Sequence, residues 1–278
     1  MKSDIDITYA GSKPGKTSAD TKAKKPASVV PAVQRAASIL TLLESYPQRR
    51  FSLADIAGRL KLPKSSAFNI CNELVECRLL RRSPEGYQLG RKLVQLGSAY
   101  ISSVDLVREF YEACRNLPES LAALAQMAVL DSDLNAVFLA RQDCNSGLHL
   151  GLRAEIGRRV PATCTASGKA MLAALSPADL ELRISGLHSF PRLTAKSILG
   201  PTELRKEVEN IRKRGYAIDD EEVLQGVYCV AMAARMPHRD DRLLAISLTS
   251  NKARIDSTRR RELVEMTDRL VDNLQSRL

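Results

Sequence analysis

The sequence predicts an α+β protein of two domains, a small helical one followed by a larger one built around a mainly antiparallel sheet. With 278 residues, the chain exceeds the commonest domain size and suits one small domain and one of roughly 150 to 200 residues. Apolar residues recur at helical spacing near the N-terminus, whereas short apolar runs typical of strands alternate with helical patterns beyond residue 105. The composition, 44% hydrophobic and 27% charged, is that of a globular protein that buries a core.

These patterns divide the chain into four segments. We expect a flexible basic arm at 1–30, a helical domain at 31–90, a linking helix at 91–105 and the larger domain at 106–278. The arm carries six Lys against three Asp and shows no apolar periodicity, so it cannot bury enough surface to order itself. An inert solubilising tail and a loose contact with phosphates are both open for it.

The helical domain begins with three short helices. In the first, apolar residues recur at Val33, Ala37, Leu40 and Leu43. The second begins at Ser52, a good N-cap with Asp55 three residues on, and is expected to bury Leu53, Ile56, Ala57 and Leu60. Pro63 then breaks the chain, because the residue before a proline is pushed out of the helical region. The third helix is expected to bury Ala67, Ile70, Cys71 and Leu74.

A hairpin follows the third helix. Its strands are Leu79–Arg82 and Tyr87–Leu89, and Ser83-Pro84-Glu85-Gly86 between them is a good type I turn sequence. Two helices joined by a turn of about three or four residues and followed by a hairpin make a winged helix-turn-helix. The next segment, Arg91–Ile101, has one apolar stripe and is interpreted as the linking helix, where a dimer contact is expected.

The winged helix predicts a protein that binds double-stranded DNA. The net charge of +10 favours a polyanionic partner, and residues 31–89 hold nine Lys or Arg against five Asp or Glu. If the third helix lies in the major groove, its side away from the core would read bases through Ser65, Ser66, Phe68, Asn69 and Asn72. Basic residues around the turn and wing would hold phosphates: Arg59, Lys61, Lys64, Arg81 and Arg82. The alternative, a protein-binding adaptor, predicts little salt dependence of any duplex binding.

The larger domain mixes strands with helices. Strands are expected at 126–130, 136–142, 148–153, 216–219, 227–235 and 243–249, and helices at 106–116, 168–175, 178–186, 203–214 and 257–277. Adjacent strands with helices outside them favour the α+β arrangement. The six cysteines and three histidines are scattered without zinc or disulfide spacing, so we expect no metal and no cofactor. No run reaches the roughly 20 apolar residues of a membrane span, so we expect a cytoplasmic protein, associated with the nucleoid through the DNA it binds.

Several motifs in this order resemble the isocitrate-lyase-regulator (IclR) family. They are Ala32 to Leu40, Ser52 to Ala57, Leu62 to Ser66, Tyr87 to Gly90, Pro161 with Thr165 to Ala170, and Arg214 to Asp219 with Glu222 and Gly226 to Ala231. The resemblance runs from about residue 31 to 278. It implies a GAF-like effector domain, a small-molecule effector that is an organic acid or an aromatic metabolite, and a homodimer or dimer of dimers on operator DNA.

The resemblance also implies a set of effector-binding residues, carried over position by position: Ala166, Ser167, Asp219, Cys229, Ser247 and Thr249. The backbone N–H groups where Ser167-Gly168 opens a helix independently favour a carboxylate ligand. Each residue also has a structural reading, because Cys229 and Ser247 lie within apolar strands and Asp219 begins an acidic run. The sequence departs from the family pattern at Ala162-Thr163-Cys164 and Ala234-Arg235, which leaves the effector's identity open.

An enzyme is the rival function. Ser167-Gly168-Lys169 is similar to the end of a phosphate-binding loop, but Thr163 stands in place of the first Gly and Ala170 in place of the Ser or Thr. Cys229 with Asp219 could suggest a nucleophile and its helper, yet no His lies in either motif to activate the thiol. We therefore expect no catalytic residues.

Overall fold

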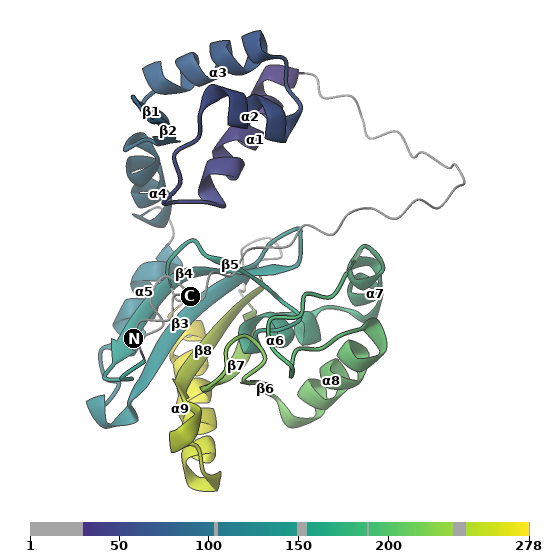
Figure 1. Cartoon of the computed structure of the whole chain (residues 1–278). Helices are drawn as coiled ribbons and strands as arrows, with labels where there is room; N and C mark the ends of the chain where they lie inside the picture. Colours follow the sequence, from purple (N-terminus) through teal and green to yellow (C-terminus); the bar gives the residue numbers. More distant parts are fainter. Residues whose placement is uncertain (1–29, 103–104, 149–154, 188, 236–242, 278) are drawn as a thin grey trace, which may run out of the picture. The chain divides into compact units, whose positions relative to one another are not determined.

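The computed structural model describes residues 30–102, 105–148, 155–187, 189–235 and 243–277. The chain divides into two compact units between Gln95 and Leu96 (Figure 1). Residues 1–29 of the expected arm lie outside the described residues, and so do all three histidines. In the described part of the chain, no helix is long and apolar enough to cross a membrane.

The first unit is a winged helix-turn-helix. Its elements in order are α1 (Pro31–Glu44), α2 (Leu53–Leu60), α3 (Lys64–Glu76), β1 (Leu80–Ser83), β2 (Gly86–Leu89) and the beginning of α4 (Lys92–Ser102). The predicted capping box forms, since the Ser52 hydroxyl accepts from the Asp55 N–H and the Asp55 carboxylate accepts from the Ser52 N–H. A left-handed Lys61, with φ of 52°, then ends α2 and begins the turn into α3.

The core of this unit corrects the stripe predicted for α1. Ile39 and Leu43 are buried, whereas Val33 and Ala37 are exposed. At 100° per residue, Val33 and Ala37 lie roughly 100° or more around the helix from the centre of the buried line, so they cannot share its contacts. The stripes of α2 and α3 follow the prediction more closely, with Leu53, Leu60 and Ile70 half-buried at the edge of the core and the rest buried.

The wing follows the predicted hairpin, one residue later in its first strand. Ser83 pairs with Gly86, which leaves Pro84 and Glu85 as the turn. Neither turn residue has a positive φ. This agrees with a type I turn, in which both central residues have a negative φ. Gly86 does have a positive φ, and a Cβ there would overlap the backbone of Phe51, whose bridge to Tyr87 extends the wing sheet. The wing is therefore fixed to the segment before α2.

The second unit is an α+β domain around an antiparallel sheet, as predicted, and the sheet has six strands among the described residues. The strand order is β5-β4-β3-β8-β7-β6. Its strands are β3 (Ala123–Leu130), β4 (Asn135–Cys144), β5 (Arg159–Pro161), β6 (Ala217–Asp220), β7 (Val227–Arg235) and β8 (Leu243–Asn251). Its helices are α5 (Asp105–Cys114), α6 (Ala166–Ala174), α7 (Pro177–Ser185), α8 (Pro201–Arg214) and α9 (Ser257–Gln275).

Helices cover both faces of this sheet (Figure 1). Helices α5 and α9 pack on one face, where Leu244, Ile246 and Leu248 of β8 enter an apolar core. Helix α6 packs on β7 and β8 from the other face, with α8 behind it. Because side chains alternate along a strand, the residues between those three, among them Ser247, face α6. This second face holds the site described below.

The predicted elements of this unit need three corrections. Strand β5 was not predicted, because its three residues are too short for an apolar pattern. Helix α6 begins at Ala166 rather than Gly168, since Thr165 is the N-cap. Of the strand expected at 148–153, residue 148 belongs to no strand and the others lie outside the described residues. The remaining boundaries agree within a few residues.

Candidate nucleic-acid interface and ligand cavity

The polar side of α3 presents the residues expected to read bases. Ser65, Phe68 and Asn69 are exposed, and Ser66 and Asn72 are half-buried. The exposed fraction of Phe68 is 42%, which is high for a large apolar side chain that could otherwise join the core. The structure therefore brings these five residues to one side of α3, opposite Ala67, Cys71 and Leu74.

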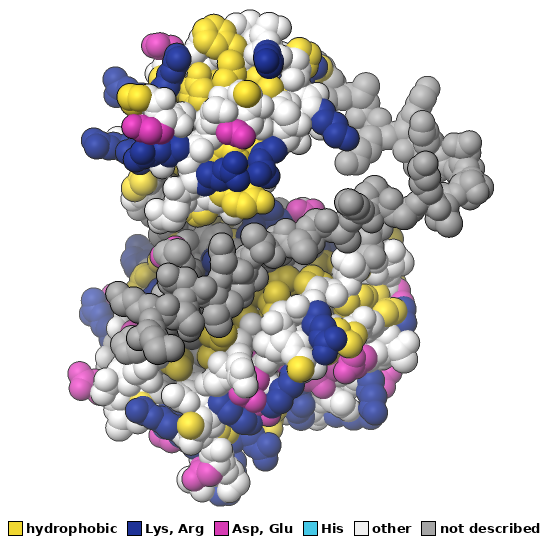
Figure 2. All heavy atoms as spheres, viewed as in Figure 1, with side chains coloured by type: hydrophobic (Ala, Val, Ile, Leu, Met, Phe, Trp, Pro, Cys, Tyr) yellow, Lys and Arg dark blue, Asp and Glu magenta, His cyan; other side chains and the backbone are white. Residues whose placement is uncertain are grey.

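The five predicted phosphate contacts are all exposed basic side chains. Arg59 and Lys61 lie at the end of α2, Lys64 begins α3, and Arg81 and Arg82 lie on β1. The Arg59 guanidinium rests 5.6 Å from the ring centroid of Tyr46, so aromatic rings support it from behind. On the visible face of this unit, Lys and Arg cover more surface than Asp and Glu (Figure 2).

Sequence reasoning missed one residue at this interface. Arg35 of α1 donates from Nη1 to Ser66 Oγ over 3.1 Å. The contact joins residues 31 positions apart, so no helical periodicity could have shown it. Because the guanidinium occupies a lone pair of the Ser66 hydroxyl, it leaves the Ser66 O–H free to donate outward.

The six residues expected to bind an effector line one cavity in the second unit, of about 70 Å³. Ala166 and Ser167 come from the first turn of α6, Asp219 from β6, Cys229 from β7, and Ser247 and Thr249 from β8. The sequence could not predict the volume of the cavity. The structure adds seven lining residues: Gln126, Phe138, Val160, Thr165, Val223, Leu224 and Val227.

The first turn of α6 forms one wall of the cavity. The Thr165 hydroxyl accepts from the Gly168 N–H at 2.9 Å, and the Thr165 carbonyl accepts from the Lys169 N–H. The N–H groups of Ala166 and Ser167 precede these, so they are the donors that the helix leaves at its N-terminus. Gly168 allows the close approach, because a Cβ there would overlap the backbone of Ala162. This wall attracts an anion.

The opposite wall is the α6-facing side of the sheet. Thr249 Oγ1 lies 3.2 Å from Cys229 Sγ and 3.4 Å from Gln126 Oε1. The Ser247 hydroxyl oxygen is buried and, among the described residues, has no hydrogen-bond partner. A buried hydroxyl without a partner costs free energy, which a ligand's polar atom would recover. Burial raises the pKa of the Cys229 thiol to about 12, so it stays protonated and serves as a packing group rather than a nucleophile.

Asp219 is the acidic group of the cavity. Its Oδ1 accepts from the N–H groups of Glu222 at 2.7 Å and Val223 at 3.4 Å, so it holds the turn that begins the loop after β6. Burial, followed by repulsion from Glu222, raises the pKa of the Asp219 carboxyl to about 7. The carboxyl therefore changes its charge near neutral pH.

A winged helix-turn-helix joined to a separate α+β domain, whose small cavity combines apolar walls with a few polar groups, defines the class of ligand-responsive DNA-binding regulators. A family model described as the IclR helix-turn-helix domain matches residues 32–84, and one described as "Bacterial transcriptional regulator IclR C-terminal" matches 98–275. The chain belongs to the IclR family of bacterial transcriptional regulators. The family's named relatives are repressors and regulators, so the chain is a regulator and not an enzyme.

Similar proteins cover nearly the same length. The transcriptional repressor IclR of Escherichia coli (strain K12) is 30% identical over 249 residues, which is 86% of this chain and 89% of the repressor. The crystal structure of an IclR family transcriptional regulator from Brucella abortus has a TM-score of 0.76 at 19% identity, covering 94% of this chain and 97% of that one. An IclR homolog from Microbacterium hydrocarbonoxydans, complexed with 4-hydroxybenzoate, has a TM-score of 0.70 at 21% identity over 88% and 99%. At these identities the two structures share the fold.

Among the described residues, no group of three or more His, Cys, Asp or Glu side chains is placed to hold a metal ion. The six cysteines are free thiols, and all but Cys77 are buried.

Proposed function

We propose that this regulator binds a specific operator through α3 and the wing, and that a small organic acid in the second-unit cavity controls that binding. The observation that carries the proposal is the pairing of opposite walls in one cavity. The first turn of α6, whose N-terminal N–H groups have no partner within the helix, faces buried hydroxyls of β8, and the Ser247 hydroxyl has no partner in the described residues. Such an arrangement suits a carboxylate.

The volume and lining of the cavity support a ligand with few heavy atoms. About 70 Å³ is well below the pockets of several hundred Å³ that hold drug-sized ligands. Phe138, Val160 and Val227 give the cavity apolar walls, which favour an aromatic acid as the second candidate. The homolog complexed with 4-hydroxybenzoate supports that second candidate.

For DNA we propose two sets of contacts. Asn69 and Asn72, with Ser65, Ser66 and Phe68, read base edges, and the five exposed basic residues hold phosphates. Arg35 orients the Ser66 hydroxyl toward the groove. Large apolar side chains exposed on α4, with Val94 at 73% exposure and Leu96 at 49%, support a homodimer or a dimer of dimers through the linking helix. A pair of winged helices would give two half-sites.

The test of DNA recognition is a fluorescent duplex covering the DNA upstream of the protein's own coding region, titrated at several salt concentrations. Asn69→Ala should weaken specific binding by about 1–3 kcal/mol and leave the salt slope unchanged. Lys61→Ala should weaken all duplexes alike and reduce the salt slope by about one. Lys206→Ala removes the same charge from exposed α8 and is the matched control. If no duplex binds at any salt, the adaptor reading replaces this one.

The test of effector control adds benzoate, 4-hydroxybenzoate and a panel of small aliphatic carboxylates to the bound complex. One class should shift operator affinity, and by reciprocity the operator should change that compound's affinity by the same factor. Equal affinity of the compound with and without operator would sink the proposed coupling.

A further inference from the structure

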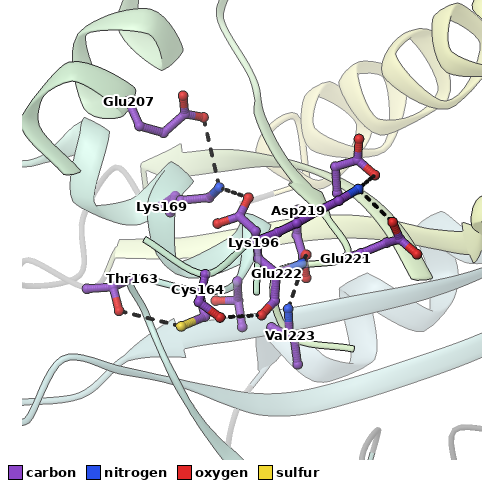
Figure 3. Close-up of polar contacts among 12 residues, drawn as sticks. Thr163, Cys164, Lys169, Lys196, Glu207, Asp219, Glu221, Glu222 and Val223 are labelled. Atoms are coloured by element: carbon purple, nitrogen blue, oxygen red, sulfur yellow. Dashed lines mark hydrogen bonds and ion pairs between the residues drawn. The ribbon is translucent and has the colours of Figure 1, made fainter. Parts of the chain in front are cut away.

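Lys169 is a buried lysine beside the cavity but does not line it. Its exposed fraction is 1%, and it follows Gly168 in the first turns of α6. Its ammonium group pairs with Glu222 and lies 3.9 Å from Glu207 Oε1 (Figure 3). Burying a lysine costs free energy unless its charge is paired. A buried Lys169 therefore needs an acidic partner.

The three partners come from three different parts of the domain. Lys169 lies on α6, Glu207 on α8, and Glu222 on the loop between β6 and β7. Glu207 is itself held by Arg214, 2.7 Å away. The Lys169–Glu222 contact spans 53 residues and ties the helix that forms one wall of the cavity to the loop that closes it. The same loop contributes Val223 and Leu224 to the lining, and Val227 lines the cavity from the start of β7.

Glu222 also connects this pair to the cavity's carboxyl group. Its backbone N–H donates to Asp219 Oδ1, and its carbonyl accepts from the hydroxyls of Thr194 and Ser197. The loop is therefore held from α6 through a side chain, from β6 through Asp219, and from the segment before α8. Figure 3 shows Glu222 between Lys169 and Asp219.

We propose that Lys169 is a positioning residue of the effector cavity, where its ion pair with Glu222 holds the 221–226 loop, and with it Asp219, against α6. The inference rests on the proposed function only for the identity of the bound group. The loop's order and the titration of Asp219 are properties of the protein without any ligand.

The charges that face Asp219 determine the sign of each expected change. Glu222 from the loop raises the pKa of Asp219, and Lys169 from α6 lowers it. The buried thiols of Cys229 on β7 and Cys164 before α6 also face this carboxyl and stay protonated, because burial raises the pKa of each. Burial, and to a smaller extent Glu207 behind it, raises the pKa of Glu222, and Arg214 pairs with Glu207.

The experiment uses Glu222→Gln and the double variant Lys169→Met with Glu222→Gln in the full chain. Removing the anion alone should lower the Asp219 midpoint by about one pH unit or more, and removing the cation as well should bring it back up. The midpoint is followed by ¹³C NMR of Asp-labelled protein, with Asp219→Asn assigning the signal. The backbone amides of residues 222 and 223 should also exchange at least tenfold faster in the double variant. The exposed Arg205–Glu181 pair, removed as Arg205→Met with Glu181→Gln, is the matched control and should change neither readout.

Three outcomes are distinguishable. If the Asp219 midpoint and both amides stay unchanged in folded variants, Lys169 has only a structural role and the inference is overturned. If they change as expected and the double variant weakens benzoate binding at least tenfold, the inference holds together with the proposed function. If they change while no carboxylate binds even the unmodified protein, the effector class is wrong and the positioning role stands.

Discussion

The two faces of the six-stranded sheet differ although the same strands form both. Along β8, Leu244, Ile246 and Leu248 enter the core under α5 and α9, whereas Ser247 and Thr249 face the cavity under α6. One face consists of apolar side chains packed together, and the other exposes hydroxyls, a thiol and a carboxyl to the cavity. The comparison teaches that one strand serves stability and recognition at once, because consecutive side chains point to opposite faces.

The largest expected effect lies on the apolar face. Ile246→Ala should lower the free energy of unfolding by about 2–5 kcal/mol, because it removes buried atoms and leaves a cavity in the core. Calorimetric unfolding of the full chain measures it. Operator affinity at a temperature where the variant is folded should stay within a few-fold. A large loss of ligand affinity in the folded variant would show that the two faces are not separate.

The second effect is the pH dependence of the cavity face. The pKa of Asp219 is raised to about 7 from an ordinary value of 3.8, so its contribution to stability is full below the ordinary value and is lost as the pH rises through 7. Asp219→Asn should therefore gain stability relative to the unmodified protein between pH 4 and 8, by up to about 4 kcal/mol. Urea unfolding at several pH values measures this gain. Exposed Asp272→Asn is the control, and an equal gain there would refute the assignment.

The third effect separates ligand recognition from stability at Ser247, the residue that follows Ile246 on β8. Ser247→Ala removes a buried hydroxyl without a partner in the described residues, so stability should stay within about 1 kcal/mol or rise. Carboxylate affinity, measured by calorimetric titration, should fall about tenfold because the ligand loses a donor. An unchanged affinity would mean that the ligand does not reach β8.

The smallest effect on carboxylate affinity is expected at Thr249. Thr249→Val keeps the shape but removes the hydroxyl that lies 3.4 Å from Gln126 Oε1. Stability should fall by about 0.5–1.5 kcal/mol. Carboxylate affinity should fall less than in Ser247→Ala, and the reverse order would move the ligand along the strand.

The sequence predicted this sheet better than it predicted the contacts around it. Strands β7 and β8 are long enough to be visible in the sequence, β7 as a continuous apolar run and β8 as apolar residues that alternate with Ser247. Strand β5 has only three residues and gave no pattern. The stripe of α1 was misplaced because Val33 and Ala37 have helical spacing but lie off the buried line.

The site was predictable in part. Residue matches to the family indicated Asp219 and Cys229, and the cavity contains both. Gln126 and Phe138 were missed, because which residues of β3 and β4 face α6 depends on register and on the bulge between Met127 and Ala128. The Lys169–Glu222 and Arg35–Ser66 contacts join residues 53 and 31 positions apart, and only folding places them together.

Gly168 has a consequence for changing the effector specificity of this regulator. No side chain fits between Gly168 of α6 and the backbone of Ala162. The helix therefore cannot lie closer to residue 162, and any side chain at position 168 would push it away. New ligands would therefore have to be accommodated from the other walls. A library that varies Gln126, Phe138, Val223 and Leu224 while keeping the helix untouched should yield folded variants with altered ligand choice, whereas one that varies residue 168 should yield mainly unfolded chains.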